Sequence, residues 1–219
     1  NGDPVDAYDL QIPVGSDTPI QGLNPRGNGW TIEITEVTFP DVPGVIFGPP
    51  EFKASPGLTL EDDGATAVAK ITPRDNIEVN LTNTALLGEV EVTKEITGGA
   101  AELVDPNTEF SFTAQIDTSE LGENVPEQDD REFKLKDGRS HVLTDLPIGA
   151  KVTITETKPT DDDAFTWGVP VINPETVEVL APNAEGYERP TVTVTNSVER
   201  TLSTFSISKK VEGDEADNP

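Results

Sequence analysis

The chain has 219 residues, with 15 lysines and arginines against 41 aspartates and glutamates, and its formal net charge is −26. Nucleic-acid phosphates and anionic membrane surfaces would both repel this charge, so neither is expected as a partner. The chain has no cysteine and a single histidine, which excludes disulfides, thiolate metal sites and a multi-histidine metal site within the chain.

Alternating apolar and polar residues, the pattern of β-strands, recur along the chain, whereas helical periodicity is almost absent. These segments are rich in Val, Ile and Thr, and turn-forming clusters separate them. The clearest predicted strands are 90–94, 110–114, 152–156, 177–179 and 192–196. Short strands separated by turns predict an all-β sandwich.

Similar segments occur twice along the chain and in the same order, which indicates two copies of one β-domain. For example, Ile32-Glu-Ile-Thr-Glu36 resembles Val152-Thr-Ile-Thr-Glu156. The matching pairs are 3–10 with 105–112, 32–36 with 152–156, 80–83 with 193–196, and 205–209 with 90–94. The second copy is complete, whereas the segment matching its first strand, 205–209, comes after it.

These matches predict three segments. Residues 1–87 form a first β-sandwich that lacks its own first strand, and residues 88–199 form a complete sandwich. Residues 200–219 form the first strand of a following domain, donated head to tail to a separate chain or to the next repeat of one polypeptide. The alternative is a fragment with arbitrary ends.

Three predicted strands of the second copy end in a polar residue that is in phase with the apolar ones. Lys94, Glu156 and Asn196 each follow two apolar residues at a spacing of two. Side chains at this spacing share one face of a strand, so all three are expected on the buried face. A lone buried charge is costly, and we therefore expect the three side chains to meet.

These three segments resemble the isopeptide-forming domains of Gram-positive surface proteins, the collagen-adhesin B-type (CnaB-like) fold of pilins and adhesin stalks. The resemblance covers the second copy and the first copy from its second strand onward. It implies tandem Ig-like sandwiches in which an amide bond joins Lys94 to Asn196. It also implies that Glu156 relays protons and that ammonia leaves.

The implied chemistry agrees with the expected burial, because an apolar environment lowers the pKa of a lysine and raises that of a glutamate. A neutral Lys94 amine could then attack the Asn196 carboxamide. The reaction occurs once, so the domain is its own substrate and not an enzyme with turnover. The alternative without a crosslink is a buried Lys94–Glu156 ion pair with Asn196 hydrogen-bonded beside it.

The first copy repeats two of the three positions. Glu36 corresponds to Glu156, as a proton relay, and Asn83 corresponds to Asn196. No matching lysine precedes them in the first copy. The fitting partner is Lys209 of a neighbouring unit, which would form the second crosslink with Asn83.

The repeats, the strong acidity and the lack of a catalytic motif predict an extracellular structural protein. We expect a repeat of a cell-surface stalk, pilus or filament, attached to the cell wall or part of the filament itself. Its partners are copies of itself or adjacent repeats, and no metal or cofactor is expected. No apolar stretch approaches the roughly 18 residues of a transmembrane helix, so membrane insertion of this segment is not expected.

Two other functions stay open at this stage. One is an adhesin module that binds a host protein or glycan through its loops. The longest predicted insertion, 117–130, has no aromatic residue to stack on a sugar. The other is a glycosidase with paired carboxylates, but in a chain with 41 acidic residues such pairs carry no information. The two tryptophans, Trp30 and Trp167, are expected to pack in the core.

Overall fold

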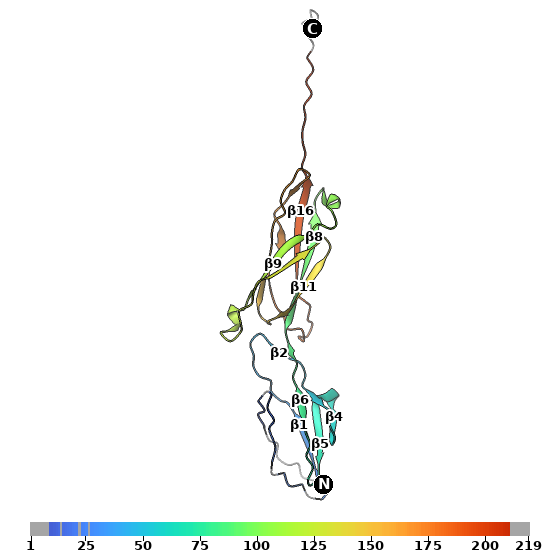
Figure 1. Cartoon of the computed structure of the whole chain (residues 1–219), viewed down its shortest axis with the longest axis vertical. Helices are drawn as coiled ribbons and strands as arrows, with labels where there is room; N and C mark the ends of the chain where they lie inside the picture. Colours follow the sequence, from blue (N-terminus) through green and yellow to red (C-terminus); the bar gives the residue numbers. More distant parts are fainter. Residues whose placement is uncertain (1–8, 14, 22, 26, 211–219) are drawn as a thin grey trace, which may run out of the picture. The chain divides into compact units, whose positions relative to one another are not determined.

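The computed structural model describes residues 9–210 except 14, 22 and 26, and its regular structure consists of strands with three short 3₁₀ turns (Figure 1). The all-β prediction is confirmed. The chain divides into two compact units. Unit 1 comprises Asn1–Thr38 and Pro49–Asn83, and unit 2 comprises Phe39–Gly48 and Thr84–Pro219. Residues 1–8 and 211–219, which belong to the predicted first and last segments, lie outside the described residues.

Unit 2 is a sandwich of two main sheets. The first sheet has the order β10 (Arg131–Leu135), β9 (Phe110–Asp117), β12 (Lys151–Glu156), β15 (Thr176–Glu178). The second has the order β11 (Ser140–Leu146), β8 (Gly88–Thr97), β16 (Thr191–Arg200), β13 (Phe165–Trp167), and β14 (Val171–Asn173) also pairs with β16. A separate two-stranded pair joins β2 (Ile46–Phe47) to β7 (Ala85–Leu86).

The first and last strands of the sandwich, β8 and β16, lie side by side and run parallel (Figure 1). The other pairings of the two main sheets are antiparallel. In the parallel register Lys94 lies opposite Val194, and Asn196 follows two residues later on β16. The topology therefore places the Lys and Asn segments on neighbouring strands of one sheet.

The core of unit 2 lies between its sheets, because alternate residues of each long strand face inward. Val90 and Val92 of β8 and Val192 and Val194 of β16 are fully buried. Burying each such side chain contributes about 1.5–3 kcal/mol. Trp167 is also in the core, as expected: it is 7% exposed, and rings of Trp167 and Phe110 meet edge-on at 5.6 Å between centroids.

Unit 1 contains less regular structure. Its antiparallel sheet has the order β1 (Trp30–Thr35), β5 (Thr66–Ile71), β4 (Leu58–Glu61), and β3 (Glu51–Lys53) pairs with β6 (Asn80–Thr82). Few large apolar side chains are buried among its described residues, and Phe52 is one of them. The expectation for Trp30 is wrong, because its side chain is 38% exposed at the beginning of β1, where little packs over it.

Residues 201–210 follow β16 and carry no secondary structure (Figure 1). All ten are exposed, including the apolar side chains of Leu202, Phe205 and Ile207. The described part of the predicted first-strand segment therefore has exposed apolar side chains.

Among the described residues, no helix is long and apolar enough to cross a membrane.

Candidate functional site

Lys94 occupies a core position of β8 although its side chain ends in an amine. The alternation of β8 directs it inward with Val90 and Val92, and it is 0% exposed. Its Nζ lies 4.6 Å from the centre of the Phe110 ring, which belongs to β9 of the facing sheet. The amine donates to the backbone carbonyls of Glu95, at 3.2 Å, and Val194, at 3.5 Å. The ring and the carbonyls fix Nζ inside the sandwich.

Glu156 and Asn196 complete the site from two other strands. Glu156 is the last residue of β12 in the facing sheet, and Asn196 lies on β16 beside β8. Asn196 Nδ2 donates to Glu156 Oε1 at 2.6 Å, and Lys94 Nζ lies 3.4 Å from Glu156 Oε2. The side chains of Lys94 and Glu156 and the whole of Asn196 are 0% exposed. The structure thus brings the three residues together out of reach of solvent.

The hydrogen bonding of this group is incomplete. Glu156 Oε2 and Asn196 Oδ1 are buried and accept no hydrogen bond among the described residues. The Lys94 amine is close to Oε2 but is not aligned with it for a hydrogen bond. A buried polar atom without a partner costs about 1–3 kcal/mol, and Asn196 Oδ1 is such an atom in the uncrosslinked arrangement.

The electrostatics of the site favour neutral side chains. Burial lowers the pKa of the Lys94 amine, and the negative charge of Glu156 opposes this only in part. Burial also raises the pKa of the Glu156 carboxyl, against the opposing effects of Lys94 and of the Asn196 hydrogen bond. Both shifts promote a neutral amine beside a protonated carboxyl, which are the forms needed for nucleophilic attack and proton transfer.

Unit 1 contains a second pair with the same atoms in contact. Asn83 Nδ2 donates to Glu36 Oε1 at 2.9 Å. Glu36 Oε2 and Asn83 Oδ1 are buried and have no hydrogen-bond partner among the described residues. Lys209, their predicted partner, lies in the exposed segment after β16. The structure brings Glu36 and Asn83 together and leaves Lys209 apart from any strand.

Phe110 is the member of the site that sequence analysis did not single out. It lies in phase with Phe112 on a clearly predicted strand, so its burial was expected. Its place under the Lys94 amine depends on how the two sheets face each other, which strand patterns do not specify. An aromatic face attracts a cation and also forms an apolar wall when the amine is neutral.

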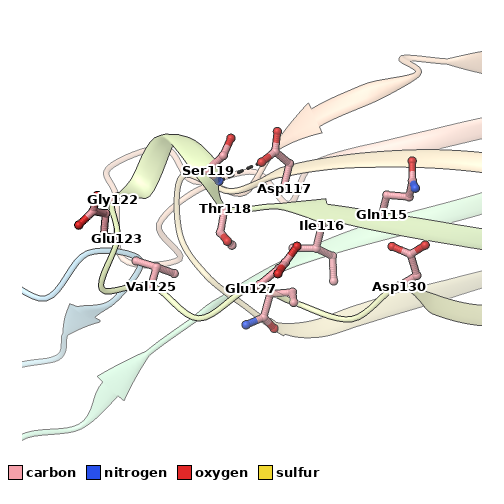
Figure 2. Close-up of a pocket in the computed structure, with 11 residues that line it drawn as sticks. Gln115, Ile116, Asp117, Thr118, Ser119, Gly122, Glu123, Val125, Glu127 and Asp130 are labelled. Atoms are coloured by element: carbon pink, nitrogen blue, oxygen red, sulfur yellow. Dashed lines mark hydrogen bonds between the residues drawn. The ribbon is translucent and has the colours of Figure 1, made fainter.

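A shallow surface hollow of about 540 Å³ lies along β9 and the loop after it (Figure 2). Its lining includes the carboxylates Asp117, Glu123, Glu127 and Asp130 and no aromatic side chain. The Ser119 side chain and then the Ser119 backbone amide, which donates a hydrogen bond to Asp117, lower the pKa of the Asp117 carboxyl. These features do not favour a sugar-binding platform.

Two neighbouring aspartates before β13 accept hydrogen bonds from backbone amides. Asp161 accepts a hydrogen bond from the Trp167 amide, and Asp162 accepts bonds from the amides of Ala164 and Phe165. They therefore order the turn before β13. In the part of the chain that the structure describes, no group of three or more His, Cys, Asp or Glu side chains could hold a metal ion.

Residues 90–199, from β8 to the end of β16, match the family model described as a domain of unknown function, DUF5979. The chain belongs to the DUF5979 family. The matched region contains Lys94, Phe110, Glu156 and Asn196, so the whole buried site of unit 2 lies within the DUF5979 domain. No curated protein matches the chain.

Several solved structures resemble parts of this DUF5979 protein at low sequence identity. The major pilin of Streptococcus pyogenes is 18% identical over 77% of this chain and 69% of its own, with a TM-score of 0.35. The pilus-presented adhesin Spy0125 (Cpa) is 16% identical over 62% of this chain and 35% of its own, with a TM-score of 0.34. An adhesin of Mobiluncus mulieris containing intramolecular disulfide, isopeptide and ester cross-links is 16% identical over 68% and 56%, with a TM-score of 0.32.

Proposed function

We propose that unit 2 is a self-crosslinking structural module of an extracellular stalk, pilus or filament. The observation that supports this most directly is the contact of Lys94, Glu156 and Asn196 inside the sandwich. An ion pair alone would leave Glu156 Oε2 and Asn196 Oδ1 without hydrogen bonds. A reaction between the amine and the carboxamide removes the buried charges and gives a neutral amide.

The proposed reaction needs only the three side chains. The neutral Nζ of Lys94 attacks the side-chain carbonyl carbon of Asn196, and the new C–N bond forms. One proton of Nζ passes by way of the Glu156 carboxyl to Nδ2 of Asn196, which already faces Oε1. The bond from the carbonyl carbon to Nδ2 then breaks and ammonia leaves. Glu156 ends in the protonation state in which it began.

The closed site favours a structural role over an enzymatic one. No external substrate can reach side chains that are 0% exposed, so the groups have only one another as reactants. The product joins β8 to β16, the first and last strands of the two main sheets of unit 2. A module whose end strands are covalently joined resists unfolding, which is what a load-bearing surface protein requires.

The composition supports an extracellular surface location attached to a cell wall or within a filament. A chain without cysteine cannot use disulfides, and an amide crosslink supplies an equivalent constraint on the unfolded state. The net charge of −26 keeps neighbouring molecules apart in solution. An exposed structural protein benefits from both properties.

Intact-mass measurement of the full chain tests this proposal. Wild type is expected to be one ammonia lighter than calculated, whereas Glu156→Ala, without its proton relay, should have its calculated mass. Glu132→Ala, at an exposed glutamate of β10, is the matched control and should retain the deficit. Protease digestion should yield a linked peptide containing Lys94 and Asn196. A wild-type mass equal to the unmodified sequence would contradict the proposal.

A further inference from the structure

We infer that Asp137 is a positioning residue for the reaction of Lys94 with Asn196: from the turn between β10 and β11 it holds the backbone of β8 next to Lys94, so that the amine stays aimed at the carboxamide. This inference rests on the proposed function, because it concerns the same reaction. It goes further by assigning a role to an exposed residue outside the buried site. The β10–β11 turn consists of residues 136–139.

The strand that carries Lys94 loses its partner strand on one edge at this residue. β11 pairs with β8 from Gly88 to Thr93, which lies opposite Ser140, the first residue of β11. On the other edge, β16 continues alongside β8 as far as Thr97. The backbone groups of β8 that point toward β11 beyond Thr93 therefore need other partners, since an unpaired backbone group away from water is costly.

The β10–β11 turn supplies two of these partners to Lys94 itself. The Lys94 amide donates to the carbonyl of Arg139 at 3.0 Å, and the Gly138 amide donates to the carbonyl of Lys94 at 2.9 Å. Gly138 has φ +66, and the Arg139 amide closes the turn onto the carbonyl of Lys136 at 3.2 Å. Two turn residues thus face one residue of β8, which is the arrangement of a β-bulge. Bulges are common beside functional sites, where they direct a side chain.

Asp137 supplies the next partner through its side chain. Its Oδ1 accepts a hydrogen bond from the Ile96 amide at 2.8 Å, so the carboxylate replaces a backbone bond that β11 no longer provides. Lys94 and Ile96 are thereby held on either side of Glu95, whose carbonyl accepts a hydrogen bond from Lys94 Nζ at 3.2 Å. The turn therefore fixes both the strand that carries the amine and a carbonyl that holds the amine. A displacement of about 1 Å in reacting groups can slow a reaction about a hundredfold.

The hydrogen bond of Asp137 differs from those of two other exposed aspartates. Asp105 and Asp117 each accept a bond from an amide two residues further along the chain, and these bonds order only the local turn. Asp137 instead reaches an amide 41 residues away in the sequence, on the strand of the reactive lysine. This long-range contact favours a positioning role over a local turn cap.

The charge of Asp137 acts on the reaction in the opposite direction. Burial lowers the pKa of the Lys94 amine, whereas the negative charges of Glu156, Asp137 and Glu95 raise it. The carboxylate therefore holds the strand but disfavours the neutral amine that attacks. Asp137→Asn keeps an oxygen that can accept the Ile96 hydrogen bond and removes the charge, so this substitution separates the two effects.

Timed crosslinking of the full chain tests the inference. Chain freshly made by cell-free synthesis is quenched in acidic denaturant at intervals, and intact mass gives the fraction that is lighter by one ammonia. Asp137→Ala is expected to react about tenfold more slowly than wild type, because β8 is less well held at Lys94. Asp105→Ala is the matched control, since it also removes a 2.8 Å hydrogen bond between an exposed aspartate and a backbone amide, and it should react at the wild-type rate.

Asp137→Asn provides a readout that a purely structural role would not change. With the Ile96 hydrogen bond retained, this variant should react at least as fast as wild type at neutral pH. Without the negative charge the pKa of the Lys94 amine is lower, so the neutral amine is available at lower pH. When freshly made chains are transferred to buffers of increasing pH, the rate should begin to rise at a lower pH in Asp137→Asn than in wild type.

Three results would overturn the inference and leave the proposed function intact. The first is Asp137→Ala reacting at the wild-type rate, and the second is Asp137→Asn reacting as slowly as Asp137→Ala. The third is Asp137→Ala being unfolded, as shown by rapid proteolysis, because the fold itself would then require Asp137. A wild-type chain that never shows the ammonia deficit contradicts the proposed function instead, whatever the variants give.

Discussion

Lys94 shows how the burial of a single residue favours the chemistry proposed for unit 2. A lysine on the solvent face of β8 would keep its ordinary pKa, but burial lowers it and makes the neutral amine accessible. The same burial raises the pKa of Glu156, so one physical cause prepares the nucleophile and the proton relay. Replacing a buried ion pair by apolar groups is often neutral or stabilising. A strong loss of stability on replacing Lys94, Glu156 and Asn196 together by apolar residues would therefore indicate a covalent link.

The raised pKa of Glu156 predicts a pH dependence in a chain that lacks the amine. In Lys94→Met the crosslink cannot form, and the nearby positive charge that lowers the pKa of Glu156 is absent. Between the ordinary pKa of about 4.3 and the raised value, folded Glu156 stays protonated while unfolded Glu156 is ionised. Unfolding then releases a proton, so stability falls as pH rises through this window, by about 1.4 kcal/mol per unit of pKa elevation.

Urea unfolding of Lys94→Met at about pH 4 and about pH 7 measures this dependence, the two values standing on either side of the ordinary glutamate range. The control is Lys94→Met/Glu156→Gln, which retains the shape of the site but has no carboxyl to ionise. The single variant is expected to lose more stability between the two pH values than the double variant. Equal pH dependence in both would show that Glu156 is not responsible.

At the scale of elements, alternation predicted the long strands of unit 2 well. Each of the five clearest patterns overlaps an observed strand, because alternating runs of Val, Ile and Thr fit a half-buried sheet. The inward phase of Lys94 and Asn196 followed from the same periodicity. The parallel pairing of β8 with β16 did not follow, because strand partners depend on contacts across 100 residues that local patterns do not contain.

Apart from β15, the short or charged strands of the two main sheets of unit 2 were not predicted from the sequence. β10 contains three charged residues among five, and β13, β14 and β15 have three residues each. Only β15 lay under a clear alternating pattern. In unit 1, β3 and β6 are equally short, and Trp30 is exposed on β1 because little of unit 1 covers it. Sequence periodicity is informative where one face is fully buried, and this condition holds in unit 2.

The turn that follows β8 depends on a glycine. Gly98 has φ +102, and a Cβ at this position would lie 2.4 Å from the carbonyl oxygen of Val198 on β16. Gly98→Ala is therefore expected to destabilise the chain by about 1–3 kcal/mol, from backbone strain and from the clash with β16.

Gly122→Ala is the matched control for the substitution at Gly98. Gly122 has φ +100, but nothing lies within 4 Å of its Cβ position, so only the backbone strain applies. Thermal unfolding of both variants should show a larger loss for Gly98→Ala. The two losses would be equal if the close approach of Gly98 to Val198 did not matter.

At the scale of the whole molecule, the proposed Lys94–Asn196 crosslink would limit how much of the chain can extend under load. In the proposed crosslinked chain, force applied through the two termini enters the unit 2 sandwich at β8 and leaves it at β16, so it passes through the Lys94–Asn196 link. The residues between them, which include most strands of unit 2, are then bypassed. The core of unit 2 can lose local structure without lengthening the molecule, which is the property that a stalk or filament requires.

Single-molecule stretching of the full chain, held at both ends, should reveal this bypass. The roughly 100 residues between Lys94 and Asn196 extend at about 3.5 Å each, so their release adds about 350 Å. Glu156→Ala should show this additional length when unit 2 unfolds, whereas wild type and the exposed-site variant Glu132→Ala should not. Unit 1 contributes the same extension to all three chains and serves as an internal reference. If wild type released the same length as Glu156→Ala, no covalent bond could join β8 to β16.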